Sequence, residues 1–330
     1  MLKLFCAALF VLGLAAPAAA EEVPILRIYT YDSFAAEWGP GPALKAGFEK
    51  TCVCIVEFTA TDSSIGALRR VQLEGDTSNA DIVLGLDTAV AGEARATGLF
   101  APHGVDLSGL LPPSPQDPDF VPFDYGYFAF VYDKDLVTNP PASFEDLIAM
   151  PDDFKIVIED PRSDTPGLGL VLWIKALYGD GASEIWAGLK PHVLTVARGW
   201  SEAYSLFLEG EADMVLSYTT SPAYHAYADN DESYAAADFG AFYAQVEVAG
   251  ILAGSEKQPL AKQFLEYLIS PEAQAIIPTT NWMYAAADIG EAYPPAFSTL
   301  ILPKETLMLD EATVTANKAA WIEEALAALQ

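Results

Sequence analysis

The sequence is poor in histidine, cysteine and basic residues. It holds three histidines, three cysteines, and 17 Lys and Arg against 46 Asp and Glu, which gives a formal net charge of −29 at pH 7. The histidines are widely separated, and no group of Cys and His has the spacing of a zinc site. Nucleic-acid binding needs a basic patch, for which the chain has too few basic residues. These deficits argue against a His-based metal site and against a nucleic-acid partner.

The sequence also lacks the motifs of common catalytic sites. It contains no Gly-x-Ser-x-Gly turn, no His-Glu-x-x-His and no glycine-rich phosphate loop. Pairs of acidic residues are frequent, but among 46 acids such pairs arise by chance. We therefore expect no catalytic residues and no metal, with an exported acid–base hydrolase as the alternative of another class.

The N-terminus has the pattern of a secretory signal. Lys3 precedes an apolar stretch over 4–14, and three alanines at 18–20 precede Glu21. The apolar stretch is too short to span a membrane, and no later run is long enough. We predict a cleavable signal peptide over 1–20 and an exported protein. Removal of the signal peptide leaves two cysteines, Cys52 and Cys54. They could form a small local disulfide or remain two free, buried thiols, and the sequence leaves both alternatives open.

Alternating strand and helix patterns run through the rest of the chain. Strands are predicted over 26–31, 54–60 and 81–86, and helices over 42–50, 63–74 and 88–97. A second series of alternating strands and helices runs from 155 to 219, and helices over 259–277 and 312–329 follow. Long extended segments near 120–132 and 244–252 would carry the chain twice from one lobe to another. The pattern predicts an α/β fold of two lobes with largely parallel sheets and a ligand in the cleft between them.

Aromatic and acidic residues collect where predicted strands end. Tyr31, Asp32 and Trp38 follow the first strand, and later loops of this kind carry Trp200, Tyr218, Tyr224 and Trp282. In open α/β sheets, ligands bind beyond the carboxyl ends of the strands. Ring faces beside carboxylates suit a flat, positively charged small molecule. The stretches 160–169 and 199–202 also open helices, whose free N–H groups can hold an anion.

On these motifs the chain resembles the periplasmic thiamine-binding proteins of bacterial ABC transporters. The matching stretches are 29–42, 80–87, 120–133, 160–162, 165–170, 199–207, 216–225 and 281–284. The resemblance implies the type II periplasmic binding protein fold. Lobe 1 would span 21–122, lobe 2 would span 123–245, and 246–330 would complete lobe 1 and add C-terminal helices. It also implies a periplasmic monomer without a cofactor, which binds thiamine and, in characterised members, its phosphate esters, and passes the ligand to the membrane permease of an ABC importer.

The resemblance assigns the ligand contacts residue by residue. Tyr224 and Trp282 would sandwich the ligand rings, with Tyr31 nearby, and Asp32 and Asp62 would meet the aminopyrimidine or the cation. Trp200 and the helix starts near Ser163 and Ser201 would meet the hydroxyethyl or phosphate end. The complete predicted set is Tyr31, Asp32, Trp38, Asp62, Ser163, Asp164, Trp200, Tyr218, Tyr224 and Trp282.

One departure and one rival ligand accompany this resemblance. Family members carry a small hydroxyl residue at the position of Asp164, and an acid there would repel a phosphate ester. Another small cation or ferric iron on the same fold is the nearest alternative. Iron-binding relatives use adjacent tyrosines, and no Tyr-Tyr pair occurs in this sequence.

Overall fold

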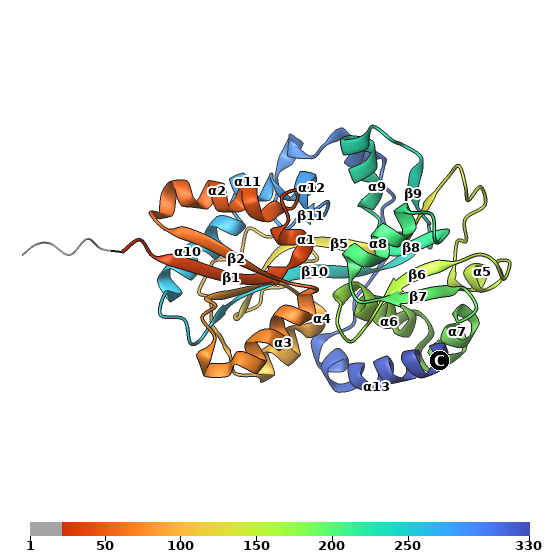
Figure 1. The fold of residues 1–330 in the computed structure, drawn as a ribbon, viewed down its shortest axis with the longest axis horizontal. Helices are drawn as coiled ribbons and strands as arrows, with labels where there is room; N and C mark the ends of the chain where they lie inside the picture. Colours follow the sequence, from red (N-terminus) through yellow and green to blue (C-terminus); the bar gives the residue numbers. More distant parts are fainter. Residues whose placement is uncertain (1–21) are drawn as a thin grey trace, which may run out of the picture.

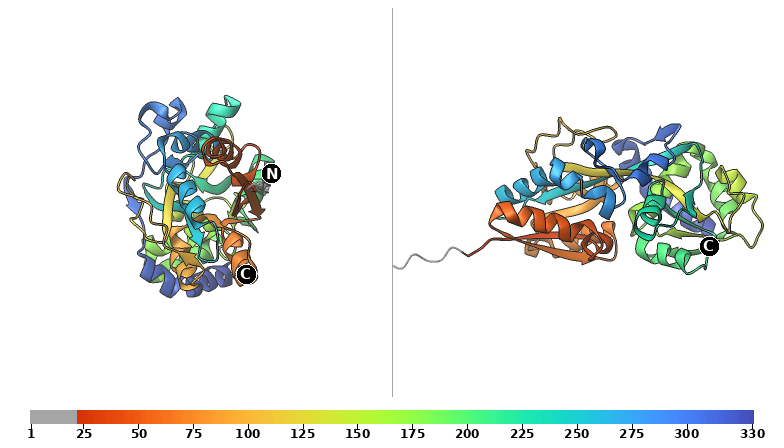
Figure 2. Two further views of the ribbon diagram at one scale, coloured as in Figure 1. Left: turned by 90° about the vertical axis from the view of Figure 1, so that its left-hand side faces the viewer. Right: turned by 90° about the horizontal axis from the view of Figure 1, so that it is seen from above.

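The computed structural model describes residues 22–330, which form two lobes side by side (Figures 1 and 2). The predicted signal peptide, 1–20, lies outside the described residues. None of the helices within 22–330 combines the length and apolar character needed to cross a membrane. The predicted α/β fold is confirmed, because helices cover both faces of a mixed sheet.

Lobe 1 lies on the left in Figure 1 and is built on three parallel strands. The strands are β1 (Ile25–Tyr31), β2 (Ile55–Thr61) and β3 (Ile82–Asp87). The helices between them are α1 (Asp32–Ala35), α2 (Pro40–Cys52), α3 (Ser64–Glu74) and α4 (Thr88–Ala96). The single turn α1 was not predicted. Helix α2 starts two residues earlier than predicted, because Pro40 already occupies its first turn, where a missing N–H costs nothing.

Lobe 2 repeats the parallel arrangement. Its strands β6 (Ile156–Glu159) and β7 (Val193–Ala197) pair in parallel, and β6 also pairs in parallel with β8 (Met214–Tyr218). Its helices are α5 (Phe144–Ile148), α6 (Thr165–Tyr178), α7 (Ala182–Leu189), α8 (Trp200–Leu208) and α9 (Ser221–Tyr224), the last continued by a π-helix over His225–Asp229. The short strand β9 (Tyr234–Ala236) closes this lobe on β5.

Two long antiparallel strands join the lobes, as the sequence predicted. They are β5 (Phe120–Asp133) and β10 (Ala241–Leu252), which pair with each other over 120–127 and 244–250. In lobe 1, β10 pairs with β3; in lobe 2, β5 pairs with β8. The resulting strand order is β2-β1-β3-β10-β5-β8-β6-β7. The lobe boundaries drawn from the sequence at 122/123 and 245/246 fall inside these two strands.

The C-terminal quarter serves both lobes. The predicted helix over 259–277 is instead broken into α10 (Gln258–Leu268), α11 (Pro271–Gln274) and the start of α12 (Ile277–Thr280). Pro271 is the first residue of α11 and Pro278 the second of α12, positions in a first helical turn where a missing N–H costs nothing. The last helix, α13 (Glu311–Leu329), contacts α4 of lobe 1 as well as α6 and α7 of lobe 2. Three short strands, β4 (Phe100–Ala101), β11 (Tyr284–Ala285) and β12 (Glu305–Leu307), pair with β5 or β10.

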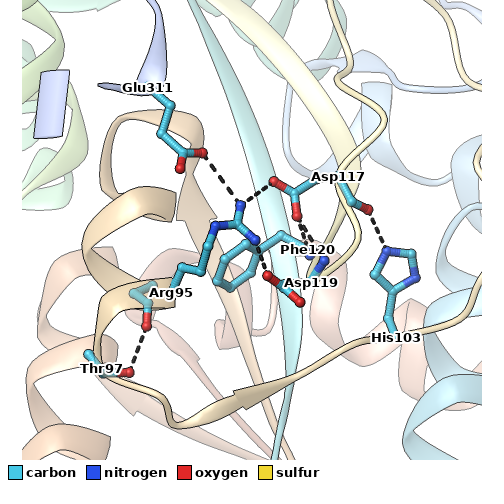
Figure 3. A network of polar contacts seen from close by, with 8 residues as sticks. Arg95, Thr97, His103, Asp117, Asp119, Phe120 and Glu311 are labelled. Atoms are coloured by element: carbon cyan, nitrogen blue, oxygen red, sulfur yellow. Dashed lines mark hydrogen bonds and ion pairs between the residues drawn. The ribbon is translucent and has the colours of Figure 1, made fainter. Parts of the chain in front are cut away.

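Arg95 fastens the start of α13 to lobe 1 (Figure 3). Its guanidinium group forms ion pairs with Asp117, Asp119 and Glu311, the last at 3.5 Å and on α13 itself. The same group lies 5.4 Å from the centre of the Phe120 ring at the start of β5. One side chain thus connects α4, the loop before β5 and the C-terminal helix.

A disulfide joins Cys52 and Cys54 at the end of α2, with their Cα atoms 5.2 Å apart. Of the two alternatives that the sequence left open, the structure therefore contains the bonded form. Neither cysteine lines the cavity between the lobes that is described below.

Candidate ligand-binding site

A cavity of about 560 Å³ lies between the two lobes. Nine of the ten predicted ligand-binding residues line it: Tyr31, Asp32, Trp38, Asp62, Asp164, Trp200, Tyr218, Tyr224 and Trp282. Ser163 does not, because its hydroxyl turns away and donates to the Arg198 carbonyl at 2.9 Å. The structure therefore brings together side chains that lie up to 251 positions apart in the sequence, between Tyr31 and Trp282. Pockets of this size hold small organic ligands.

A column of stacked rings forms the lobe 2 wall of the cavity, and of these rings only Trp200 and Tyr204 line the cavity itself. Trp200 stacks on Tyr204 with 4.8 Å between ring centres, Tyr204 stacks on His225 at 5.9 Å, and His225 stacks on Tyr234 at 3.7 Å. The indole N–H of Trp200 donates to Ser217 Oγ at 2.8 Å, which fixes the plane of the ring. A ring held in this way can receive a ligand at little cost in side-chain entropy. Tyr204 and His225 were not predicted as part of this wall.

Tyr224 and Trp282 contact each other directly instead of leaving a gap for a ligand ring. Their ring centres are 5.5 Å apart and their planes meet at 72°, an edge-to-face contact. Tyr227 adds a second ring at 5.6 Å from Trp282. The sandwich predicted from the sequence stays a prediction, and it requires these two rings to separate around a ligand. A ligand ring must either stack on an outer face of the pair or separate the two rings.

The backbone of Trp282 is held in a strained conformation. Its φ angle is +56°, a left-handed value that a bulky residue rarely adopts. The Trp282 N–H donates to the carbonyl of Ile277, the first residue of α12, at 3.1 Å, so this helix fixes the turn. Such strain costs on the order of 1–3 kcal/mol and collects at functional sites. The strain thus marks Trp282 as a residue positioned for a contact in the cleft.

A buried carboxylate forms the floor of the cavity, and the sequence analysis missed it. Glu247 is only 6% exposed, and its Oε2 accepts a hydrogen bond from the Tyr31 hydroxyl at 2.8 Å. Asp124 is its partner residue across the β5–β10 pair, and Asn281 donates to Asp124 at 2.7 Å. Burial raises the pKa of Asp124 to about 8, and burial next to Asp124 raises the pKa of Glu247 well above its usual value.

The signal for these two acids lay in the crossing strands themselves. Gln245 and Glu247 interrupt an otherwise apolar segment, and Asp124 interrupts an aromatic one. A charged residue is almost never fully buried without a partner or a function. Which side of the strand each one faced could not be derived from the pattern, because both strands are buried on both faces.

Two hydrogen bonds cross the cavity from lobe to lobe. Ser64 Oγ lies 3.1 Å from Thr165 Oγ1, and the Ser201 hydroxyl donates to Asp32 Oδ1 at 3.3 Å. The backbone is also close here, since a Cβ added at Gly199 would stand 2.9 Å from the Asp62 carbonyl oxygen. Asp32 and Asp62 therefore lie where lobe 1 meets the start of α8.

The charge of the cavity lining has one sign. Four carboxylates line it, from Asp32, Asp62, Asp164 and Glu247, and the lining among residues 22–330 contains no Lys, Arg or His. No group of three or more His, Cys, Asp or Glu side chains in this part of the chain is arranged to hold a metal ion. Aromatic faces together with uncompensated carboxylates favour an organic cation over an anion.

Comparison with known proteins agrees with this geometry. The family described as bacterial extracellular solute-binding protein matches residues 34–275. The thiamine-binding periplasmic protein of Brucella abortus is 48% identical over 331 residues, covering 99% of this chain and 98% of that protein. Its counterpart in Escherichia coli K12 is 48% identical over 303 residues, covering 91% and 92% of the two chains.

A solved structure extends the likeness to three dimensions. A periplasmic thiamin binding protein superposes with a TM-score of 0.91 at 46% identity, covering 96% of this chain and 100% of that one. Identity at this level over nearly the whole length, with the same two-lobe fold, places the sequence in one group. The chain belongs to the bacterial extracellular solute-binding proteins and, within them, to the periplasmic thiamine-binding proteins.

Proposed function

We propose that this protein captures thiamine in the periplasm, in the cleft between its two lobes. The observation that carries the proposal is the lining of the cleft, where ring faces stand beside four carboxylates without a basic side chain. Thiamine combines a permanently cationic thiazolium with a flat aminopyrimidine. A cation over an aromatic face gains about 0.5–2 kcal/mol, depending on how far it is desolvated.

The proposal assigns each region of the cleft a part of the ligand. The Trp200 column and the Tyr224–Trp282 pair offer stacking faces, and Glu247 at the floor offers a buried carboxyl group that a bound cation would ionise. A carboxylate in a largely buried site attracts a cation more strongly than one in water, because the effective dielectric constant is lower. Asp32 and Asp62, where the lobes meet, are placed to accept hydrogen bonds from an amino group.

The captured thiamine is delivered unchanged to the membrane permease of an ABC importer. Solute-binding relatives of this kind hold a ligand without converting it, and the cleft has a shape and charge for binding. The protein acts as a monomer and needs no cofactor, since thiamine itself is the cargo. An acid–base hydrolase with the same buried carboxylates is the alternative of another class, and turnover of a substrate would favour it.

Titration calorimetry of the mature protein with thiamine tests the proposal. We expect one site per chain, and thiamine recovered after long incubation should be chemically unchanged. Ferric iron and the polyamine spermidine serve as the comparison ligands. No heat with thiamine, or tighter binding of a comparison ligand, would contradict the proposed function.

A further inference from the structure

Asp164 is a buried acid aimed into the cleft with an unpaired oxygen. It is 4% exposed, it lines the cavity, and its Oδ2 has no hydrogen-bond partner. It stands at the N-cap of α6 but makes no side-chain capping bond. A Cβ added at Gly199, the residue before α8, would lie 3.8 Å from Asp164 Oδ2. The carboxylate therefore stands between the first turns of two helices, α6 and α8.

The start of a helix attracts an anion, through its free N–H groups and its dipole. In this chain the anion at that place is the protein's own carboxylate. Burial raises the pKa of Asp164 to about 7, although the backbone N–H groups of Trp200 and Thr165 act in the opposite direction. A second anion from a ligand would have to share this position with Asp164.

A second buried acid stands behind Asp164. Glu159, at the end of β6, is fully buried, and neither of its carboxylate oxygens has a hydrogen-bond partner. Burial, followed by the charge of Asp164, raises the pKa of Glu159 well above its usual value. The two carboxyl groups together thus leave three unpaired oxygens, with no basic residue in the cavity lining to offset them.

Basic side chains occur nearby but outside the cavity. Arg162 pairs with Asp160 at 2.5 Å, and Arg198 pairs with Glu202 at 3.4 Å. Both guanidinium side chains are mostly exposed, at 67% and 80%. They are engaged at the surface, so they do not compensate the acids inside.

We propose that Asp164, with Glu159 buried behind it, makes this cleft selective for ligands that end in an uncharged hydroxyl and excludes their phosphate esters. This inference rests on the proposed thiamine-binding function and specifies which form of thiamine enters. Either form of a carboxyl group can accept a hydrogen bond from a hydroxyl, so thiamine binds without proton uptake. A phosphate can enter only after Asp164 has taken up a proton, which weakens its binding at neutral pH.

The test compares thiamine with thiamine monophosphate by calorimetry at pH 7.5. The wild-type protein should bind thiamine more tightly than thiamine monophosphate. The variants Asp164→Ser and Asp164→Asn should each raise the ratio of monophosphate to thiamine affinity by about tenfold or more, because a like charge a few Å away is removed from a low-dielectric site. Glu159→Gln should largely retain selectivity, because Asp164 keeps its charge.

Two control variants separate this effect from a general change of charge. Asp106→Ser removes one charge from an exposed turn of lobe 1, and Asp62→Ser removes one from another part of the cavity lining. Neither should change the ratio as much as Asp164→Ser does. An unchanged ratio in both Asp164 variants, with thiamine binding retained, overturns the inference and leaves the proposed function intact. If the wild-type protein does not bind thiamine, the proposed function itself is overturned. Asp164→Asn keeps the size of the side chain. It therefore still tests the inference if the Asp164→Ser variant does not fold.

Discussion

Ser64 Oγ and Thr165 Oγ1 lie 3.1 Å apart and join the first turn of α3 in lobe 1 to the first turn of α6 in lobe 2. Both hydroxyls belong to buried residues that line the cavity. This contact, with the Ser201–Asp32 bond beside it, holds the two lobes together across the ligand site. The closed cleft is therefore stabilised by contacts that an open cleft would lose.

We expect Ser64→Ala to speed the release of thiamine. One hydrogen bond contributes about 0.5–1.5 kcal/mol, so the closed form should weaken by a factor of about two to ten. Stopped-flow fluorescence gives the dissociation rate. Ser205→Ala is the matched control, because this cavity hydroxyl bonds only within its own helix, to the Ser201 carbonyl. Equal release rates for wild type and Ser64→Ala would show that the contact does not hold the cleft closed.

Trp282→Ala and Tyr224→Ala should each weaken thiamine binding about tenfold with little change in melting temperature. Stacking contributes about 0.5–1.5 kcal/mol and a cation–π contact about 0.5–2 kcal/mol, and tenfold in affinity corresponds to about 1.4 kcal/mol. Trp321→Ala on α13 removes a tryptophan outside the cavity and should leave affinity unchanged. If the two cleft variants unfold before they lose affinity, these rings serve the core and not the ligand.

The ligand-free protein should lose stability as the pH rises from 5 to 8.5. Burial raises the pKa of Asp87 and Asp164 to about 7 and that of Asp124 to about 8, so the folded state binds more protons than the unfolded state in this range. The stability present below the ordinary carboxyl pKa is lost as the pH passes through these raised values.

Thermal melts across this range measure the effect. Asp124→Asn should flatten the pH profile, because the amide keeps an acceptor for Asn281 but does not titrate. A melting temperature that increases up to pH 8.5 would contradict the raised pKa values.

Thiamine affinity should increase between pH 6 and 8.5. A bound cation favours the ionised form of Glu247, whose pKa burial raises well above its usual value, so binding releases a proton. Glu247→Gln should reduce the affinity and remove most of its pH dependence, while its side-chain oxygen can still accept from Tyr31. Calorimetry in buffers of different ionisation enthalpy counts the released protons. A pH-independent affinity for wild type would show that Glu247 does not face the cation.

Arg95→Ala should destabilise the protein without affecting ligand affinity. Its guanidinium group joins two carboxylates of the loop before β5 to Glu311 on α13 and lies over Phe120, so three acids would lose their common partner. Partly buried networks of this kind are worth on the order of 1–3 kcal/mol, more than single surface pairs. Denaturant unfolding measures the loss. The control is Arg198→Ala, which removes a surface ion pair whose arginine side chain is 80% exposed.

The sequence by itself determined the α/β class, the two crossing strands and most of the site. Alternating patterns revealed the strands and helices, because local hydrophobic periodicity follows the geometry of each element. Tyr31, Trp200, Tyr218 and Trp282 could be assigned to the cleft because they sit where strands or helices end, which is where ligands bind in such sheets. The resemblance in the motifs pointed to the same family as the comparisons.

Only the tertiary structure decided how these side chains meet. Glu247 and Asp124 lie mid-strand, and their pairing depends on the β5–β10 register, which strands buried on both faces do not encode in their pattern. Ser163 turns out of the cavity and Asp164 turns in, although the two are neighbours in the sequence. Their directions follow from long-range contacts, since Ser163 bonds to the Arg198 carbonyl before α8 and Thr165 to Ser64 of lobe 1. Such long-range packing contacts cannot be read from the local sequence.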